Sequence, residues 1–171
     1  MKPFAEAGNR LLWVRPSPDG KLYKLQSGDE DVAVLRWEKR TGSLAQAETS
    51  TGKWTLKRIG YLQPRLSVRR AGSEQDLAWF EPGVGGGGAV HLASGHIFRW
   101  SSNFWRAEWA WVNAAGKHGV KFHRQFSEKE REGTVQIEPG VLPERELPIL
   151  IVLGWYLIIL QTEDAAMLPQ S

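Results

Sequence analysis

The chain has 171 residues and a formal net charge of +3, and it contains no cysteine. A chain of this length can bury about 70% of its unfolded surface, so it can form a core without disulfides or metals. The lack of cysteine excludes disulfides, zinc ribbons and a thiol nucleophile, and residues 1–10 have no apolar stretch typical of a secretory signal. We therefore expect a single domain over residues 1–171 and a cytoplasmic location.

Short segments of alternating polar and apolar residues occupy most of the chain. Clusters of Gly, Pro, Asn, Asp and Ser separate them at the spacing of all-β proteins, and such short links join antiparallel neighbours. About twelve strands are predicted between residues 11 and 138. They lie near residues 11–15, 21–25, 32–39, 44–48, 53–59, 65–70, 76–81, 89–93, 96–101, 105–112, 119–126 and 134–138.

Two neighbouring segments, 53–59 and 65–70, carry a concentration of cations. Their expected inward-facing residues are Trp54, Leu56, Leu66 and Val68. The period of two then turns Lys57, Arg65 and Arg69 outward, with Arg58 and Arg70 close by. Near an anionic membrane, each such cation adds about 1 kcal/mol of attraction to lipid phosphates. These five residues are the candidates for binding lipid headgroups, and the alternative is an ordinary solvated exterior.

Motifs for catalysis or metal binding are weak. The run "GVGGGGAV" lacks the Lys-Ser/Thr of a P-loop and leads into a predicted strand, which favours a hairpin loop. His91 and His96, like His118 and His123, are an odd number of residues apart, which places each pair on opposite faces of a strand. No G-x-S-x-G motif occurs. We therefore predict no catalytic residue, no metal site and no cofactor.

Aromatic residues recur at period two in segment 105–112, "WRAEWAWV". One face would present Trp105, Ala107, Trp109 and Trp111, and the other Arg106, Glu108 and Ala110. This pattern is typical of a half-buried strand whose tryptophans point into the core. The alternative, a series of stacking platforms for nucleic acid, is less common, so we expect no nucleic-acid partner.

The segment 147–160, "LPILIVLGWYLIIL", is a run of fourteen uncharged residues. A helix that spans a membrane needs about 20 apolar residues, and acidic residues flank this run on both sides. A buried strand is another alternative, although fourteen residues exceed the usual strand length. A helix that is apolar on every side must be enclosed. We predict an enclosed helix over 147–161, a short tail over 162–171 and no transmembrane span.

The predicted helix and strands have compatible dimensions. Strands of six or seven residues are about 20–23 Å long, which matches the length of the helix. Twelve tilted strands would close at a radius of about 12 Å and leave room for one helix. The predicted fold class is therefore mainly β, a closed antiparallel barrel of about twelve strands that encloses a hydrophobic C-terminal α-helix.

Three stretches in the second half of the chain carry a resemblance to a known family. They are "SGHIFRWSSNFWRAEWAWVNAAGKHGVKFHRQ", "EGTVQIEP" and "LPILIVLGWYLIILQTED". Their order is similar to the last strands and central helix of the tubby C-terminal-like superfamily, which includes tubby proteins, phospholipid scramblases and LURP-one-related proteins. The resemblance implies a twelve-stranded barrel threaded by its own C-terminal helix. The chain lacks the cysteine-rich acylation segment and acidic calcium loop of scramblases, and it shows no tubby phosphoinositide motif.

Two classes of function remain open. The first is a non-catalytic module that binds anionic phospholipid or a protein partner through its outer surface, which would place it peripherally at a membrane. The second is an enzyme with its active site on loops at one rim, where His91, His96 and His118 would gather near Asp29 and Asp31. The sequence favours the first class, because no motif supports the second.

Overall fold

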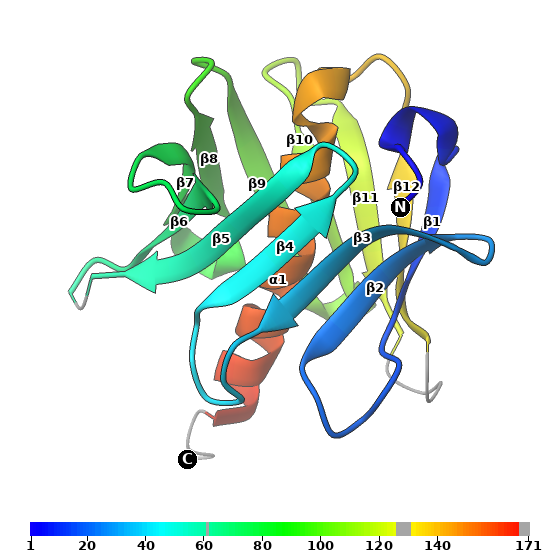
Figure 1. Ribbon diagram of the computed structural model, residues 1–171. Helices are drawn as coiled ribbons and strands as arrows, with labels where there is room; N and C mark the ends of the chain where they lie inside the picture. The colour runs from blue at the N-terminus through cyan, green and yellow to red at the C-terminus, as the bar shows by residue number, and fades with distance from the viewer. Residues whose placement is uncertain (61, 126–130, 168–171) are drawn as a thin grey trace.

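The computed structural model describes residues 1–60, 62–125 and 131–167, with the backbone alone for residue 131 and residues 164–167. The described residues form twelve antiparallel strands closed into a barrel around one α-helix, which confirms the predicted fold class (Figure 1). The strands are β1 (Arg10–Val14), β2 (Leu22–Ser27), β3 (Glu30–Trp37), β4 (Ala45–Thr49), β5 (Gly52–Ile59), β6 (Arg65–Arg70), β7 (Asp76–Pro82), β8 (Gly88–Leu92), β9 (Ile97–Asn103), β10 (Glu108–Val112), β11 (His118–Arg124) and β12 (Arg131–Ile137).

The order of the strands around the barrel follows the order along the chain, and β1 closes the barrel by pairing with β12. Successive loops therefore alternate between the two ends of the barrel. The helix α1 (Leu147–Met167) begins at the end that carries the β8–β9 turn, which we name the entry end. It leaves at the exit end, where the β1–β2, β3–β4, β5–β6, β7–β8 and β9–β10 loops lie (Figure 1).

The helix fills the barrel. Each residue from 150 to 160 is buried, so the enclosed helix predicted from its all-round apolarity is confirmed. Trp155 stacks on Trp13 of β1 with ring centroids 5.4 Å apart, and Tyr156 stacks on Trp37 of β3 at 5.2 Å. The indole of Trp111 donates a 2.7 Å hydrogen bond to the Leu150 carbonyl. By length and composition Glu144–Glu163 could also cross a membrane, yet most of it is buried inside the barrel.

The helix starts at Leu147 as predicted, with Pro148 in its first turn, where a missing backbone N–H leaves no hydrogen bond unmade. Its end differs from the prediction, because it continues from residue 161 to Met167. The added stretch begins with two polar residues, Thr162 and Glu163, which contacts with the rim of the barrel hold, and residues 168–171 of the predicted tail lie outside the described residues. The apolar run therefore marked the enclosed part of the helix and not its full length.

All twelve predicted strands match the observed ones to within three residues, with residue 126 of segment 119–126 outside the described residues, but the start of segment 105–112 has a different local structure. Residues Phe104–Arg106 form a 3₁₀ turn, and β10 begins only at Glu108. Trp109 and Trp111 are buried as expected, whereas Trp105 is 100% exposed. The strand β10 begins later than predicted because the Asn103 side chain accepts a 3.4 Å hydrogen bond from the Arg106 N–H, which stabilises a turn over residues 104–106.

Candidate functional site

Three of the five predicted cations lie on the barrel exterior. In the β5–β6 ladder, Lys57 is opposite Ser67, Arg65 is opposite Ile59 and Arg69 is opposite Thr55, all in the outward register. Lys57 is exposed, and the side chains of Arg65 and Arg69 are 48% and 34% exposed. The predicted outward orientation of these three side chains is therefore confirmed.

The other two cations lie apart from this exterior face. Arg58 is opposite Leu66 and Arg70 is opposite Trp54, so both share the inward register. They avoid the core because each sits at a strand end, Arg58 at the exit end and Arg70 at the entry end. The five residues are consequently divided among one exterior face and two opposite ends.

Asp76 engages part of the exterior basic face. Its carboxylate accepts hydrogen bonds from Arg69 Nε at 2.8 Å and Ser67 Oγ at 2.7 Å, and it lies 3.6 Å from Arg65. Burial raises the pKa of Asp76, but these hydrogen bonds and the neighbouring guanidinium charges outweigh burial and hold its pKa below the ordinary value. Arg69 is thus committed to an internal contact, while Lys57 and Arg65 are both exposed.

The structure does not gather the histidines at one rim. His91 points outward from the outer face of β8, where its ring stacks on Trp79 with ring centroids 5.1 Å apart. His118 is exposed at the start of β11. His96 lies in the β8–β9 turn, and its Nδ1 is 2.8 Å from Glu146. Asp31 instead forms a 3.0 Å ion pair with Lys24. Among the described residues, no three His, Asp or Glu side chains come close enough to hold a metal ion.

Ser94, His96 and Glu146 form a close cluster at the entry end. The Ser94 hydroxyl donates to one Glu146 carboxylate oxygen, and His96 Nδ1 contacts the other. In a hydrolase triad, the imidazole bridges acid and hydroxyl through its two different nitrogens. Here the nearest approach of Ser94 to the imidazole, 3.4 Å, is to the same Nδ1. This arrangement lacks the two-nitrogen bridge of such a triad, and its contacts connect the β8–β9 turn to the residues just before α1.

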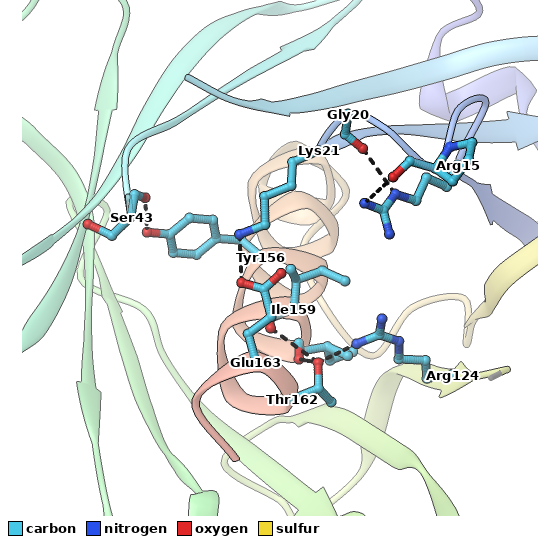
Figure 2. Close-up of polar contacts among 11 residues, drawn as sticks. Arg15, Gly20, Lys21, Ser43, Arg124, Tyr156, Ile159, Thr162 and Glu163 are labelled. Atoms are coloured by element: carbon cyan, nitrogen blue, oxygen red, sulfur yellow. Dashed lines mark hydrogen bonds and ion pairs between the residues drawn. The ribbon is translucent and has the colours of Figure 1, made fainter. Parts of the chain in front are cut away.

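A second polar cluster closes the exit end around the last turns of α1 (Figure 2). Lys21, whose side chain is only 9% exposed, forms a 2.6 Å ion pair with Glu163 and lies 5.1 Å above the Trp37 ring. Arg124 donates to the Thr162 hydroxyl. These two cations therefore hold the helix in the barrel.

The sequence did not identify this exit-end cluster, because its partners are far apart in the chain. Lys21 and Glu163 are separated by 142 positions, and the Tyr156 hydroxyl donates to the Ser43 carbonyl across 113 positions (Figure 2). Only the polar residues that directly follow the apolar run indicated that the helix emerges at this point.

Three consecutive loops at the exit end present large apolar side chains to solvent. Leu62 in the β5–β6 loop is 90% exposed, Val84 in the β7–β8 loop is 102% exposed, and Trp105 in the β9–β10 loop is 100% exposed. Phe104, beside Trp105, is 47% exposed. Elsewhere in the described part of the chain, the comparably apolar exposed side chains are Met1 and Ile97, each about half exposed.

The sequence contains a signal for these loop residues that the strand pattern obscured. Leu62 and Val84 are apolar residues inside turn-forming stretches, "GYLQP" and "PGVGG", where an apolar side chain has no strand face to join. Trp105 fits the period of Trp109 and Trp111, so the pattern predicts a strand position for it although it lies in a turn. A large apolar residue inside a turn-forming stretch therefore indicates an apolar side chain that is exposed on a loop.

The charged residues of the loops differ between the two ends. Among the exposed loop residues that the structure describes, the entry end carries the acids Asp29, Glu74, Glu138 and Glu144 with the cations Lys117 and Arg145. The exit end carries the cations Lys39, Arg40 and Arg106 with the acids Asp19 and Glu38, and residues 126–130 of its β11–β12 loop lie outside the described residues. Over the described exposed loop residues, the exit end is therefore the more basic of the two.

Comparisons of the chain with protein-family models, with curated proteins and with solved structures give no match.

Proposed function

We propose that this chain is a non-catalytic module that attaches to an anionic membrane surface through the cations at and beside its exit end. The observation that carries this proposal is the placement of exposed positive charge. Lys57 and Arg65 lie on the outer faces of β5 and β6. Lys39 and Arg40 lie in the neighbouring β3–β4 loop, and Arg106 lies in the β9–β10 loop. The barrel interior is occupied by α1, which favours a function of the outer surface over a carrier function.

The expected strength of this attraction is modest. Five cations at about 1 kcal/mol each would give a dissociation constant on the order of 0.1–1 mM, which is a weak and reversible attachment. Stable attachment to membranes generally needs a second contribution besides basic charge. The proposed function therefore predicts binding that depends on both salt and lipid charge.

The test is a charge reversal at Lys57, Arg65 and Arg106, measured by cosedimentation with phosphatidylcholine vesicles that do or do not contain phosphatidylserine. We expect the K57E/R65E/R106E variant to lose most of its binding to anionic vesicles at low salt. The loss should be smaller at high salt, where the Debye length approaches about 3 Å and the charges are already screened. Neutral vesicles should show little difference between variant and parent.

The matched control reverses three exposed cations of the opposite end, Lys53, Arg70 and Lys117. This K53E/R70E/K117E variant changes the net charge equally and should retain its binding. Equal losses in both variants would show that only net charge matters. A parent protein that does not bind phosphatidylserine vesicles at low salt would refute the proposed function.

A further inference from the structure

We infer that Leu62, Val84 and Trp105 insert into the boundary between lipid headgroups and acyl chains, so that the barrel docks end-on through its exit end. This inference rests on the proposed membrane attachment and adds to it the orientation of docking and the residues that enter the lipid. It supplies the second, apolar contribution that basic charge alone does not provide.

The three side chains are neighbours on one rim. Strands β5 to β10 follow one another around the barrel, so the β5–β6, β7–β8 and β9–β10 loops are consecutive at the exit end (Figure 1). Consecutive loops are two strands apart, a spacing of about 10 Å. Insertion of one loop would therefore bring the other two close to the same membrane surface.

The β9–β10 loop is built to present Trp105 outward. The preceding residue, Phe104, lies edge-on to the Trp109 ring at 5.9 Å, and a Cβ on Gly86 would come within 2.6 Å of the Phe104 ring. Ala107 closes the turn in the left-handed region at φ 51°. Because Phe104 occupies the adjoining apolar contact, Trp105 remains in solvent.

The β7–β8 loop holds Val84 in a similar way. The Gly83 N–H donates to the Gly87 carbonyl at 2.8 Å, which closes a tight loop, and Gly85 and Gly86 have φ values of 73° and 83° that favour glycine. Gln161 near the end of α1 donates a 3.0 Å hydrogen bond to the Gly86 carbonyl. The glycine run thus forms a defined turn, fixed to the central helix, with Val84 at its tip.

The chemistry of these loops matches an anionic lipid surface. The stretches 59–64, 82–88 and 102–107 contain no Asp or Glu, and Arg106 directly follows Trp105. Glu81 and Glu108, the nearest acids along the chain, lie on the strands behind the loops. Tryptophan is favoured at membrane interfaces, because its ring is apolar and its N–H can reach polar groups.

The three apolar side chains lie on the tips of three separate loops. This arrangement suits lipid, which adapts to each side chain, better than a protein partner, which needs a continuous complementary surface.

The absence of cysteine allows a direct test with single labelled sites. Leu62→Cys, Val84→Cys and Trp105→Cys would each carry an environment-sensitive nitrobenzoxadiazole label, and Ala114→Cys in the exposed β10–β11 turn at the entry end is the control. On vesicles of phosphatidylcholine and phosphatidylserine, we expect a blue shift and brighter emission at the three exit-end sites. The label at residue 114 should keep its emission in water.

A second measurement removes the apolar side chains. The V84S/W105S variant should bind the same vesicles about tenfold more weakly even at high salt, where charge is screened, because transfer of apolar area into lipid does not depend on salt. Ile97→Ser is the matched control, because it removes a half-exposed apolar side chain at the start of β9, and this variant should bind like the parent. Near-ultraviolet circular dichroism checks that both variants are folded.

The outcomes separate this inference from the proposed function. Labels that stay in water while the protein sediments with vesicles would overturn insertion and leave electrostatic attachment intact. Labels that report burial without vesicles, together with elution as a dimer, would overturn insertion because the loops then contact a second copy of the chain. A parent protein that does not bind vesicles would overturn both.

Discussion

At the scale of single residues, the environment of a cation decides whether it is available to a ligand. Arg69 and Arg70 are adjacent in the sequence, yet Arg69 is held by Asp76 on the exterior and Arg70 is exposed at the entry end. Alternation of polar and apolar residues predicts which face a side chain occupies. It does not show the carboxylate that faces Arg69 from β7, so the predicted basic surface was larger than the accessible one.

Asp76 should make the stability of the barrel depend on pH. Its pKa is lowered in the folded state, so the ionised carboxylate stabilises the fold above the unfolded-state pKa of about 3.9. This stabilisation is lost as the pH falls through the folded-state pKa. We expect Asp76→Asn to lower the free energy of unfolding at pH 7 by about 1–2 kcal/mol, measured by urea denaturation.

The difference between Asp76→Asn and the parent should begin to shrink below about pH 4, where the unfolded carboxylate takes up a proton, and should vanish once the pH falls through the lower folded-state pKa. Asp29→Asn, in the exposed β2–β3 turn, is the control and should change stability by less than about 0.5 kcal/mol. A constant difference between Asp76→Asn and the parent at all pH values would contradict this account.

At the scale of elements, periodicity predicts strands and the enclosed helix well because both bury regular faces. The predictions become wrong where local hydrogen bonds or polar rim contacts intervene, as at Phe104–Arg106 and beyond residue 161 of α1. Both involve side chains that meet partners outside the repeating pattern. The apolar loop tips belong to the same class, since no strand or helix period describes them.

The packing of α1 against β11 gives a prediction for Gly154. In the middle of a helix, Gly→Ala normally stabilises by about 1 kcal/mol. At Gly154, however, an added Cβ would overlap the ring of the buried Phe122. We expect Gly154→Ala to lower the melting temperature, because overpacking in a filled core costs about 1–3 kcal/mol.

Gly20→Ala is the control for this effect, because an added Cβ there meets nothing within 4 Å. Its melting temperature should stay close to that of the parent. A stabilised Gly154→Ala variant would show that Phe122 can move away and that the contact between helix and strand is looser than the structure indicates.

At the scale of the whole molecule, the barrel and the helix depend on each other. The inward residues of the strands have little to bury against without α1, and α1 is apolar on every side without the strands. The apolar part of α1, residues 150–160, therefore forms the centre of the core. This dependence followed from the sequence because a helix with no polar face must be enclosed, and the rest of the chain offered only strands to enclose it.

A charge at the centre of this arrangement should abolish folding. Ile151 has no exposed surface, and Ile151→Asp would place an unpaired carboxylate among the inward side chains of the barrel. The cost is several kcal/mol, against a total stability of about 5–15 kcal/mol for a domain of this kind. We expect the variant to lose its near-ultraviolet circular dichroism and cooperative thermal transition, whereas Thr134→Asp on the exposed face of β12 should keep both. A folded Ile151→Asp protein would mean that the helix can leave the barrel, and the enclosed core described above would then be wrong.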